Sequence, residues 1–218
     1  MPFRLDDVEI SWLGHAAFLI TYKDTRYYID PFKIKAKGLA DVVLITHEHF
    51  DHLSVEDLRK IVKSDTEMVA PESCRDNLKA FKMGVLKLVK PGESINVKNA
   101  RVETIPAYNI NKFRAPGVVY HPKVQEGVGY ILEVGGLRIY HAGDTDFTPE
   151  MRSLKVDVAL VPVSGTFVMT AEEAAKAVNT FKPKVAIPMH FGAIVGDKSD
   201  AENFKKLSEV DVVILEKE

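Results

Sequence analysis

The chain has 218 residues, of which 46% are hydrophobic and 28% charged, a composition typical of a soluble globular protein that can bury a sizeable core. The formal net charge is −2, with lysine and glutamate dispersed along the chain, which argues against a protein whose main task is to coat nucleic acid. The single cysteine, Cys74, excludes an intramolecular disulfide and a cysteine-rich zinc site.

The first half of the chain is rich in predicted strands. An uninterrupted apolar run at 42–46 predicts a strand that is covered on both faces. Ser54 and Asp57 form a capping pattern that predicts a helix to about Lys63, and a second helix is expected over 72–84. The predicted strands of this half are 8–13, 17–22, 26–30, 42–46 and 67–71.

The second half repeats this pattern of strands followed by helices. Thr170 and Glu173 predict the start of a helix that runs through Phe181, and Ser199 and Glu202 predict the start of a last helix. The predicted strands are 100–108, a hairpin over 127–143 that turns at Gly135–Gly136, 156–163, 184–190 and 210–216.

Two β-rich halves, each followed by helices, predict an α+β fold in which two sheets pack face to face with helices outside. We find no linker or repeat, so one domain is expected over residues 1–218. The segment 109–127 is rich in Asn, Pro and Gly and is predicted to be a long loop. Loops of this length in a compact domain are usually functional or disordered.

Three histidines lie within six residues in "HEHFDH", directly after the apolar strand. His47 and His49 are two residues apart, so in an extended segment their side chains leave the same face, and Asp51 and His52 follow at a turn. Imidazoles plus a carboxylate, with no thiolate, suit zinc first, with iron or manganese as alternatives. A polar turn with chance histidines is the competing interpretation, which this density of ligands disfavours.

More candidate ligands follow two other apolar strands. "RIYHAGDTD" supplies His141, Asp144 and Asp146, and "VAIPMHFG" supplies His190. Because functional loops leave the carboxyl ends of strands in layered α/β proteins, these side chains are expected to converge. Taken alone, His190 is equally well explained as a structural histidine; beside an incomplete metal cluster, the ligand interpretation is favoured.

A His-x-His-x-Asp-His run, a strand-terminal Gly-Asp and a later strand-terminal His resemble the metallo-β-lactamase superfamily. The resemblance extends from "WLGHAAFLI" and "YIDPF" to "PMHFG", nearly the whole chain. The chain is most similar to small prokaryotic metal-dependent hydrolases related to ascorbate-6-phosphate lactonase, which share Gly14-His15 and "HAGDTD". The resemblance implies a four-layer αβ/βα sandwich, in which two mixed sheets carry helices on their outer faces. It is far less specific for the substrate than for the fold.

The resemblance also implies two metal sites that share one carboxylate. The first takes His47 and His49, the second takes Asp51, His52 and His190, and Asp144 bridges the two.

The third ligand of the first site departs from the family pattern. "IPAYN" places Asn109 where relatives commonly carry a histidine, and His121 lies twelve residues further on. Asparagine is a poor zinc ligand, so we assign His121. The alternatives are a site that is one ligand short or uses Asn109, with His121 a loop histidine near the substrate mouth.

Other polar residues are candidates for contact with substrate or for support of a ligand. His15 follows a strand end and a glycine, and His141 precedes the "AGD" turn, where a packed role is as good an interpretation. Lys112 and Arg114, beside Tyr108 on the long loop, are cations that suit a phosphate or carboxylate, although solvated loop charges are the commoner outcome.

The resemblance implies hydrolysis at a dinuclear, preferentially zinc, centre. A bridging hydroxide would attack a small ester, lactone or phosphodiester, and Asp51 would orient the nucleophile as well as bind metal. We expect a small-molecule substrate, anionic groups included, without nucleic acid or membrane contact. The sequence has no apolar targeting segment, which favours a cytoplasmic protein, and a homo-oligomer stays open.

Three rival functions remain. RNA- or DNA-processing nucleases of the superfamily share the histidine run, but they usually add a clamp domain or a long insertion. Di-iron redox domains typically carry Glu where this chain has His49, beside a flavin domain that this chain has no room for. The third rival is a non-catalytic metal-binding or interaction module. The full ligand set for two metal ions disfavours it.

Overall fold

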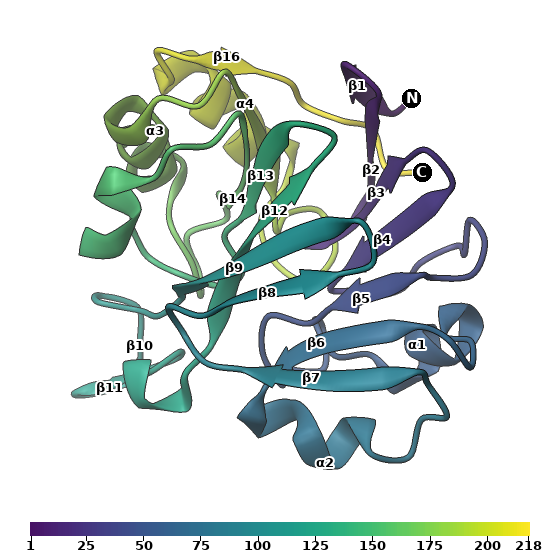
Figure 1. Cartoon of the computed structure of the whole chain (residues 1–218). Coiled ribbons are helices and arrows are strands. Elements are labelled where there is room, and N and C mark those ends of the chain that lie inside the picture. The colour runs from purple at the N-terminus through teal and green to yellow at the C-terminus, as the bar shows by residue number, and fades with distance from the viewer.

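A computed structural model describes all 218 residues. Two seven-stranded sheets pack face to face, with helices on their outer sides (Figure 1). The expected α+β sandwich of two mixed sheets is therefore confirmed. None of the helices is both long enough and apolar enough to cross a membrane.

The first sheet holds β1 to β7 in chain order. Its first four strands pair antiparallel, and the pairs from β4 to β7 are parallel. Helices α1 (Val55–Ile61) and α2 (Arg75–Leu78) accompany the parallel half. The strands are β1 (Phe3–Leu5), β2 (Val8–Gly14), β3 (Ala17–Tyr22), β4 (Thr25–Ile29), β5 (Val42–Leu44), β6 (Glu67–Pro71) and β7 (Val85–Val89).

The second sheet has the order β16-β15-β14-β13-β12-β9-β8. It is antiparallel from β8 to β13 and parallel from β13 to β16. Helices α3 (Ala171–Phe181) and α4 (Lys198–Leu207) lie at its parallel end. The strands are β8 (Ser94–Val97), β9 (Ala100–Pro106), β12 (Val128–Val134), β13 (Leu137–His141), β14 (Val158–Pro162), β15 (Val185–Met189) and β16 (Asp211–Val212).

Side chains that alternate in direction along the strands build one hydrophobic layer on each side of the first sheet. Phe18 and Ile20 of β3 join the large core between the sheets, whereas Leu19 joins a smaller core with Leu58 and Ile61 of α1. A slip of one residue in the pairing of β3 would reverse both faces, so burial on both sides fixes its register.

Three predicted elements are wrong in their bounds. The helix expected over 72–84 is a short turn followed by α2, because Gly84 and Val85 donate backbone hydrogen bonds to Thr66 and lead into β7. Helix α4 is capped by Asp197 rather than Ser199; the Asp197 carboxylate accepts from the Ser199 amide at 2.7 Å. The strand expected over 210–216 is confined to β16, since the chain then crosses back to the first sheet, where the Glu218 amide donates to Trp12.

The segment predicted as a long loop is a small hairpin. Strands β10 (Phe113–Ala115) and β11 (Val118–Val119) pair, and a 3₁₀ turn, Lys123–Gln125, follows. At its base the Asn109 amide donates to the His121 carbonyl at 2.8 Å. The hairpin therefore returns His121 to a place beside Asn109, although twelve residues separate them in sequence.

Candidate metal centre

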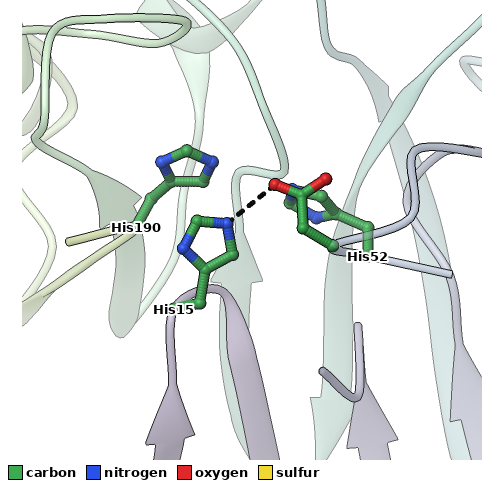
Figure 2. A group of neighbouring side chains, drawn as sticks. His15, His52 and His190 are labelled. Carbon is green, nitrogen blue, oxygen red and sulfur yellow. Dashed lines mark hydrogen bonds and ion pairs between the residues drawn. The ribbon is translucent and has the colours of Figure 1, made fainter. Parts of the chain in front are cut away.

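The candidate ligands converge where strands of both sheets end. His47, His49, Asp51 and His52 follow β5, and Asp144 and His190 follow β13 and β15. His121 comes from the base of the β10–β11 hairpin. Figure 2 shows His15, at the turn from β2 to β3, together with His52 and His190, which come from separate elements.

A first group of ligand atoms is formed by three histidines. One ring nitrogen from each of His47, His49 and His121 lies within 4.8 Å of the other two. The Nε2 atom of His121 is 3.1 Å from Nδ1 of His49. The structure therefore brings His121 to the histidine pair, whereas Asn109 lies behind its ring.

A second group combines three histidines and a carboxylate. Ligand atoms of His15, Asp51, His52 and His190 also lie within 4.8 Å of one another. The Nε2 atom of His15 is 3.0 Å from Oδ2 of Asp51 (Figure 2). His15 thus lies within the group and holds Asp51 in place.

Asp144 lies between the two groups. Its Oδ1 is 3.1 Å from Nε2 of His52, and its Oδ2 is 3.1 Å from Nε2 of His190 and 3.5 Å from Nε2 of His121. One carboxylate is therefore within reach of both groups, as the family resemblance implies for a bridging ligand.

The outer nitrogens of the histidines that follow β5 are held by buried polar partners. Asp30 accepts a hydrogen bond from Nδ1 of His52 at 2.7 Å and another from the Thr46 hydroxyl at 2.6 Å. Having donated to Asp30, the Thr46 oxygen accepts from Nδ1 of His47 at 3.0 Å. In the neutral rings, the form that binds metal, these bonds place the proton on Nδ1 and leave Nε2 with its lone pair.

Two further histidines are held in the same way. The Asn109 Oδ1 atom accepts from Nδ1 of His121 at 2.9 Å and from its backbone amide at 2.9 Å. The Asn109 Nδ2 atom donates to the Phe167 carbonyl at 2.9 Å, which fixes the orientation of the amide. The Ser164 hydroxyl lies 3.2 Å from Nδ1 of His190. All four rings therefore turn Nε2 toward Asp144.

Four inner atoms of the cluster have no hydrogen-bond partner. Nε2 of His47, His52 and His190 and Oδ1 of Asp144 are buried and unpaired. The 3.1 Å contacts of Asp144 with His52 and His190 are close, but they do not satisfy hydrogen-bond geometry. Buried unpaired polar atoms are costly, so atoms that converge in this way fit a bound cation. Imidazole and carboxylate donors suit zinc, iron or manganese.

Opposite pKa shifts describe the charge of the cluster. Burial lowers the pKa of His47 well below its ordinary value, and neighbouring His52 lowers it further. Burial alone would lower the pKa of His52 too, but Asp144 and Asp30 raise it well above its ordinary value. Burial would raise the pKa of Asp144, yet His190 and His52 hold it well below its usual range. Asp144 thus carries negative charge at the point where the unpaired nitrogens meet.

The loop cations expected to contact substrate do not face the cluster. Lys112 is only 10% exposed, and its ammonium pairs with Glu173 at 2.6 Å and with Asp146 at 3.3 Å. Asp146 also accepts from the amides of Ile110 and Asn111, so this group ties the hairpin to the second sheet. Arg114 lies on the exposed strand β10. Lys112 therefore already has two carboxylate partners, which disfavours the expected role in binding substrate.

His141 has a structural place. It is fully buried, its Nε2 donates to the Ala16 carbonyl at 2.8 Å, and its Nδ1 accepts from the Gly143 amide at 3.2 Å. These bonds brace the turn that carries Asp144 and leave the ring no free atom for substrate. These bonds favour the packed role of His141 over contact with substrate.

The supporting residues Asp30, Thr46 and Ser164 were missed from the sequence. Each directly follows a strand or lies within two residues of its end: β4, β5 and β14. The candidate ligands were predicted from their positions at strand ends. The same criterion could have identified these three supporting residues.

Comparison with known proteins identifies the class. Residues 9–190 match the family model described as a beta-lactamase superfamily domain. The chain belongs to this family, as a metal-dependent hydrolase, and the resemblance to the metallo-β-lactamase superfamily is confirmed.

Its relatives include UPF0173 proteins. A UPF0173 protein of Pyrococcus furiosus is 35% identical over 207 residues, which cover 91% of this chain and 90% of that protein. A UPF0173 metal-dependent hydrolase of Thermococcus onnurineus is 34% identical over 224 residues, covering 95% and 96% of the two chains.

Solved structures show the same fold. A candidate metal-dependent hydrolase from Parabacteroides distasonis superposes with a TM-score of 0.84 and 33% identity over 99% of this chain and 98% of that chain. Igni18, a metallo hydrolase from Ignicoccus hospitalis, gives a TM-score of 0.75 at 23% identity over 96% and 95% of the chains, a likeness of fold alone.

Proposed function

We propose that this hydrolase uses two divalent metal ions, zinc in preference to manganese or iron, to cleave a small ester, lactone or phosphodiester. One observation carries the proposal. Four imidazoles have Nδ1 engaged by a partner and turn Nε2 toward the buried carboxylate of Asp144. Such outer partners fix ring tautomer and orientation at metal sites.

The ligands divide into two sets around Asp144. His47, His49 and His121 would hold one ion, Asp51, His52 and His190 the other, with Asp144 shared. When bound, two ions in such a site supply an activated water at neutral pH and stabilise developing negative charge on a carbonyl or phosphoryl oxygen.

The protein's own contribution is to hold the reacting groups in position. Asp30, Thr46, Asn109 and Ser164 hold the rings, so no reorientation is needed during the reaction. Asp51 lines the pocket beside the cluster, held by His15 at 3.0 Å, where its carboxylate can orient the attacking water and accept its proton. The adjoining pocket, about 270 Å³, is the size of a small-molecule site rather than a groove for a nucleic acid strand.

The test is hydrolysis by protein stripped of metal and reloaded with Zn²⁺, Mn²⁺ or Fe²⁺ separately. We expect metal-dependent cleavage within a panel of bis-p-nitrophenyl phosphate, p-nitrophenyl esters and γ-lactones. Asp51→Asn and His49→Ala should each lower kcat/KM by at least about 100-fold. Glu56→Gln, on an exposed carboxylate of α1, is the matched control and should retain full activity. Loaded protein that cleaves none of the panel, or an Asp51→Asn variant with full activity, would overturn the proposal.

A further inference from the structure

A pocket of about 270 Å³ opens directly beside the metal ligands. One wall is formed by the cluster itself, including Asp51 and Asp144. The rest of the lining is apolar and comes from four separate segments: Phe50, Tyr120, Phe167 and Ile194. The volume is just below the roughly 300–1,000 Å³ typical of ligand sites.

The apolar wall faces solvent to an unusual extent. Phe50 is 69% exposed and Ile194 39% exposed, while the rings of Tyr120 and Phe167 pack edge to face at 4.8 Å. Scattered exposed apolar residues need no explanation, but a group gathered around one pocket marks a binding site. Because the pocket is continuous with the candidate metal ligands, its natural occupant is part of the substrate.

Apart from the candidate metal ligands and the Tyr120 hydroxyl, the lining offers no polar side chain to an anion. No lysine or arginine lines the pocket. The nearby Lys112 is neutralised by Glu173 and Asp146, and Lys123 pairs with Glu150 at 2.8 Å. A charged group placed against the apolar wall would lose its hydration without compensation.

We propose, on the basis of the proposed function, that the substrate is uncharged away from its scissile bond and places an aryl or alkyl group against Phe50, Tyr120, Phe167 and Ile194. This narrows the substrate class read from the sequence, which included anionic compounds. Affinity for the group comes from burial of apolar surface, and the cluster acts only on the bond at its edge.

Two matched substrate pairs test the charge preference on either side of the scissile bond. p-Nitrophenyl valerate is compared with mono-p-nitrophenyl glutarate, in which a carboxylate replaces the terminal methyl. p-Nitrophenyl acetate is compared with its 3-carboxy-4-nitrophenyl analogue. We expect kcat/KM to favour the neutral member at least tenfold in one pair or both. Ile194→Lys, which adds a cation to the apolar wall, should shrink that preference at least tenfold, whereas Leu207→Lys, on an exposed site of α4, should leave it unchanged.

Binding of two dyes separates this inference from the hydrolytic function. N-Phenyl-1-naphthylamine is neutral, and 8-anilinonaphthalene-1-sulfonate has the same skeleton with a sulfonate. The neutral dye should bind at least tenfold more tightly, and Phe167→Ala should weaken it while Leu207→Ala should not. Preferential binding of the neutral dye by protein that cleaves no member of the substrate panel would support the pocket and refute the proposed function. Ester hydrolysis with equal use of charged and neutral substrates, or equal binding of both dyes, would overturn this inference alone.

Discussion

Substitution of Asn109 by Ala tests how the first metal site is completed. The Asn109 Oδ1 atom accepts two hydrogen bonds from His121, one from the ring and one from the backbone, both at 2.9 Å. The substitution removes both and leaves the ring free to rotate or to change its tautomer. If His121 is the third ligand, metal affinity of the first site should fall while the second site is unaffected.

The magnitude follows from the two lost bonds. Neutral hydrogen bonds contribute about 0.5–1.5 kcal/mol each, so about 1–3 kcal/mol is at stake. Since about 1.4 kcal/mol is a factor of ten, zinc affinity should fall roughly 10- to 100-fold, the range seen for outer partners of metal-binding histidines. Without these bonds the His121 ring must be ordered when metal binds, and the cost of that ordering lowers the affinity.

The assay is a zinc titration against a competing chromophoric chelator. The wild-type protein should show two bound ions, and Asn109→Ala should weaken one of them. Asn109→Asp, which keeps the acceptor, should recover much of the loss. Asn111→Ala, on the same loop but bonded to Glu173, is the matched control. Unchanged binding of both ions to Asn109→Ala would refute this role of Asn109, as would equal weakening of both sites.

Three further predictions concern the scaffold. Burial raises the pKa of Cys74 to about 12, so its thiol should resist alkylation by iodoacetamide at pH 8 in native protein and react fully in denaturant; rapid native labelling would contradict its buried place. Ser54→Ala removes the N-cap of α1 and should cost about 1 kcal/mol in the free energy of unfolding measured with urea; no loss would refute the cap. Burial would raise the pKa of Asp57, but hydrogen bonds from Lys60 and Ser54 lower it below 3.8. Ionised Asp57 therefore stabilises the fold above pH 3.8, and this contribution is lost as the pH falls further. The loss of unfolding free energy in Asp57→Asn should accordingly shrink between pH 5 and about pH 2. A loss that stays constant over this range would refute the prediction.

The sequence predicted most of the fold because the relevant signals are local. Alternating strands such as β3 and the apolar run of β5 are visible in a few residues, and the histidine run follows β5 directly. Asp144 and His190 were identified by the same rule, since each follows a buried strand. The ligands that this rule named lie together in the structure.

What the sequence missed depends on contacts between distant segments. Asp30 holds His52 across 22 positions, and Ser164 lies beside His190 across 26. The pairing of Lys112 with Glu173 spans 61 positions, so its neutralised charge was not visible in the loop. The short strands β1, β7 and β8 also escaped prediction, because their few residues carry little periodicity and are stabilised by their neighbours in the sheet.

The most direct test of the central claim is a crystal structure of zinc-loaded protein with anomalous diffraction recorded on either side of the zinc edge. The proposal predicts two zinc peaks per chain. One should lie among His47, His49 and His121, the other among Asp51, His52 and His190, with Asp144 in contact with both. A single peak, or zinc bound elsewhere with the Nε2 atoms of these rings still unligated, would contradict it.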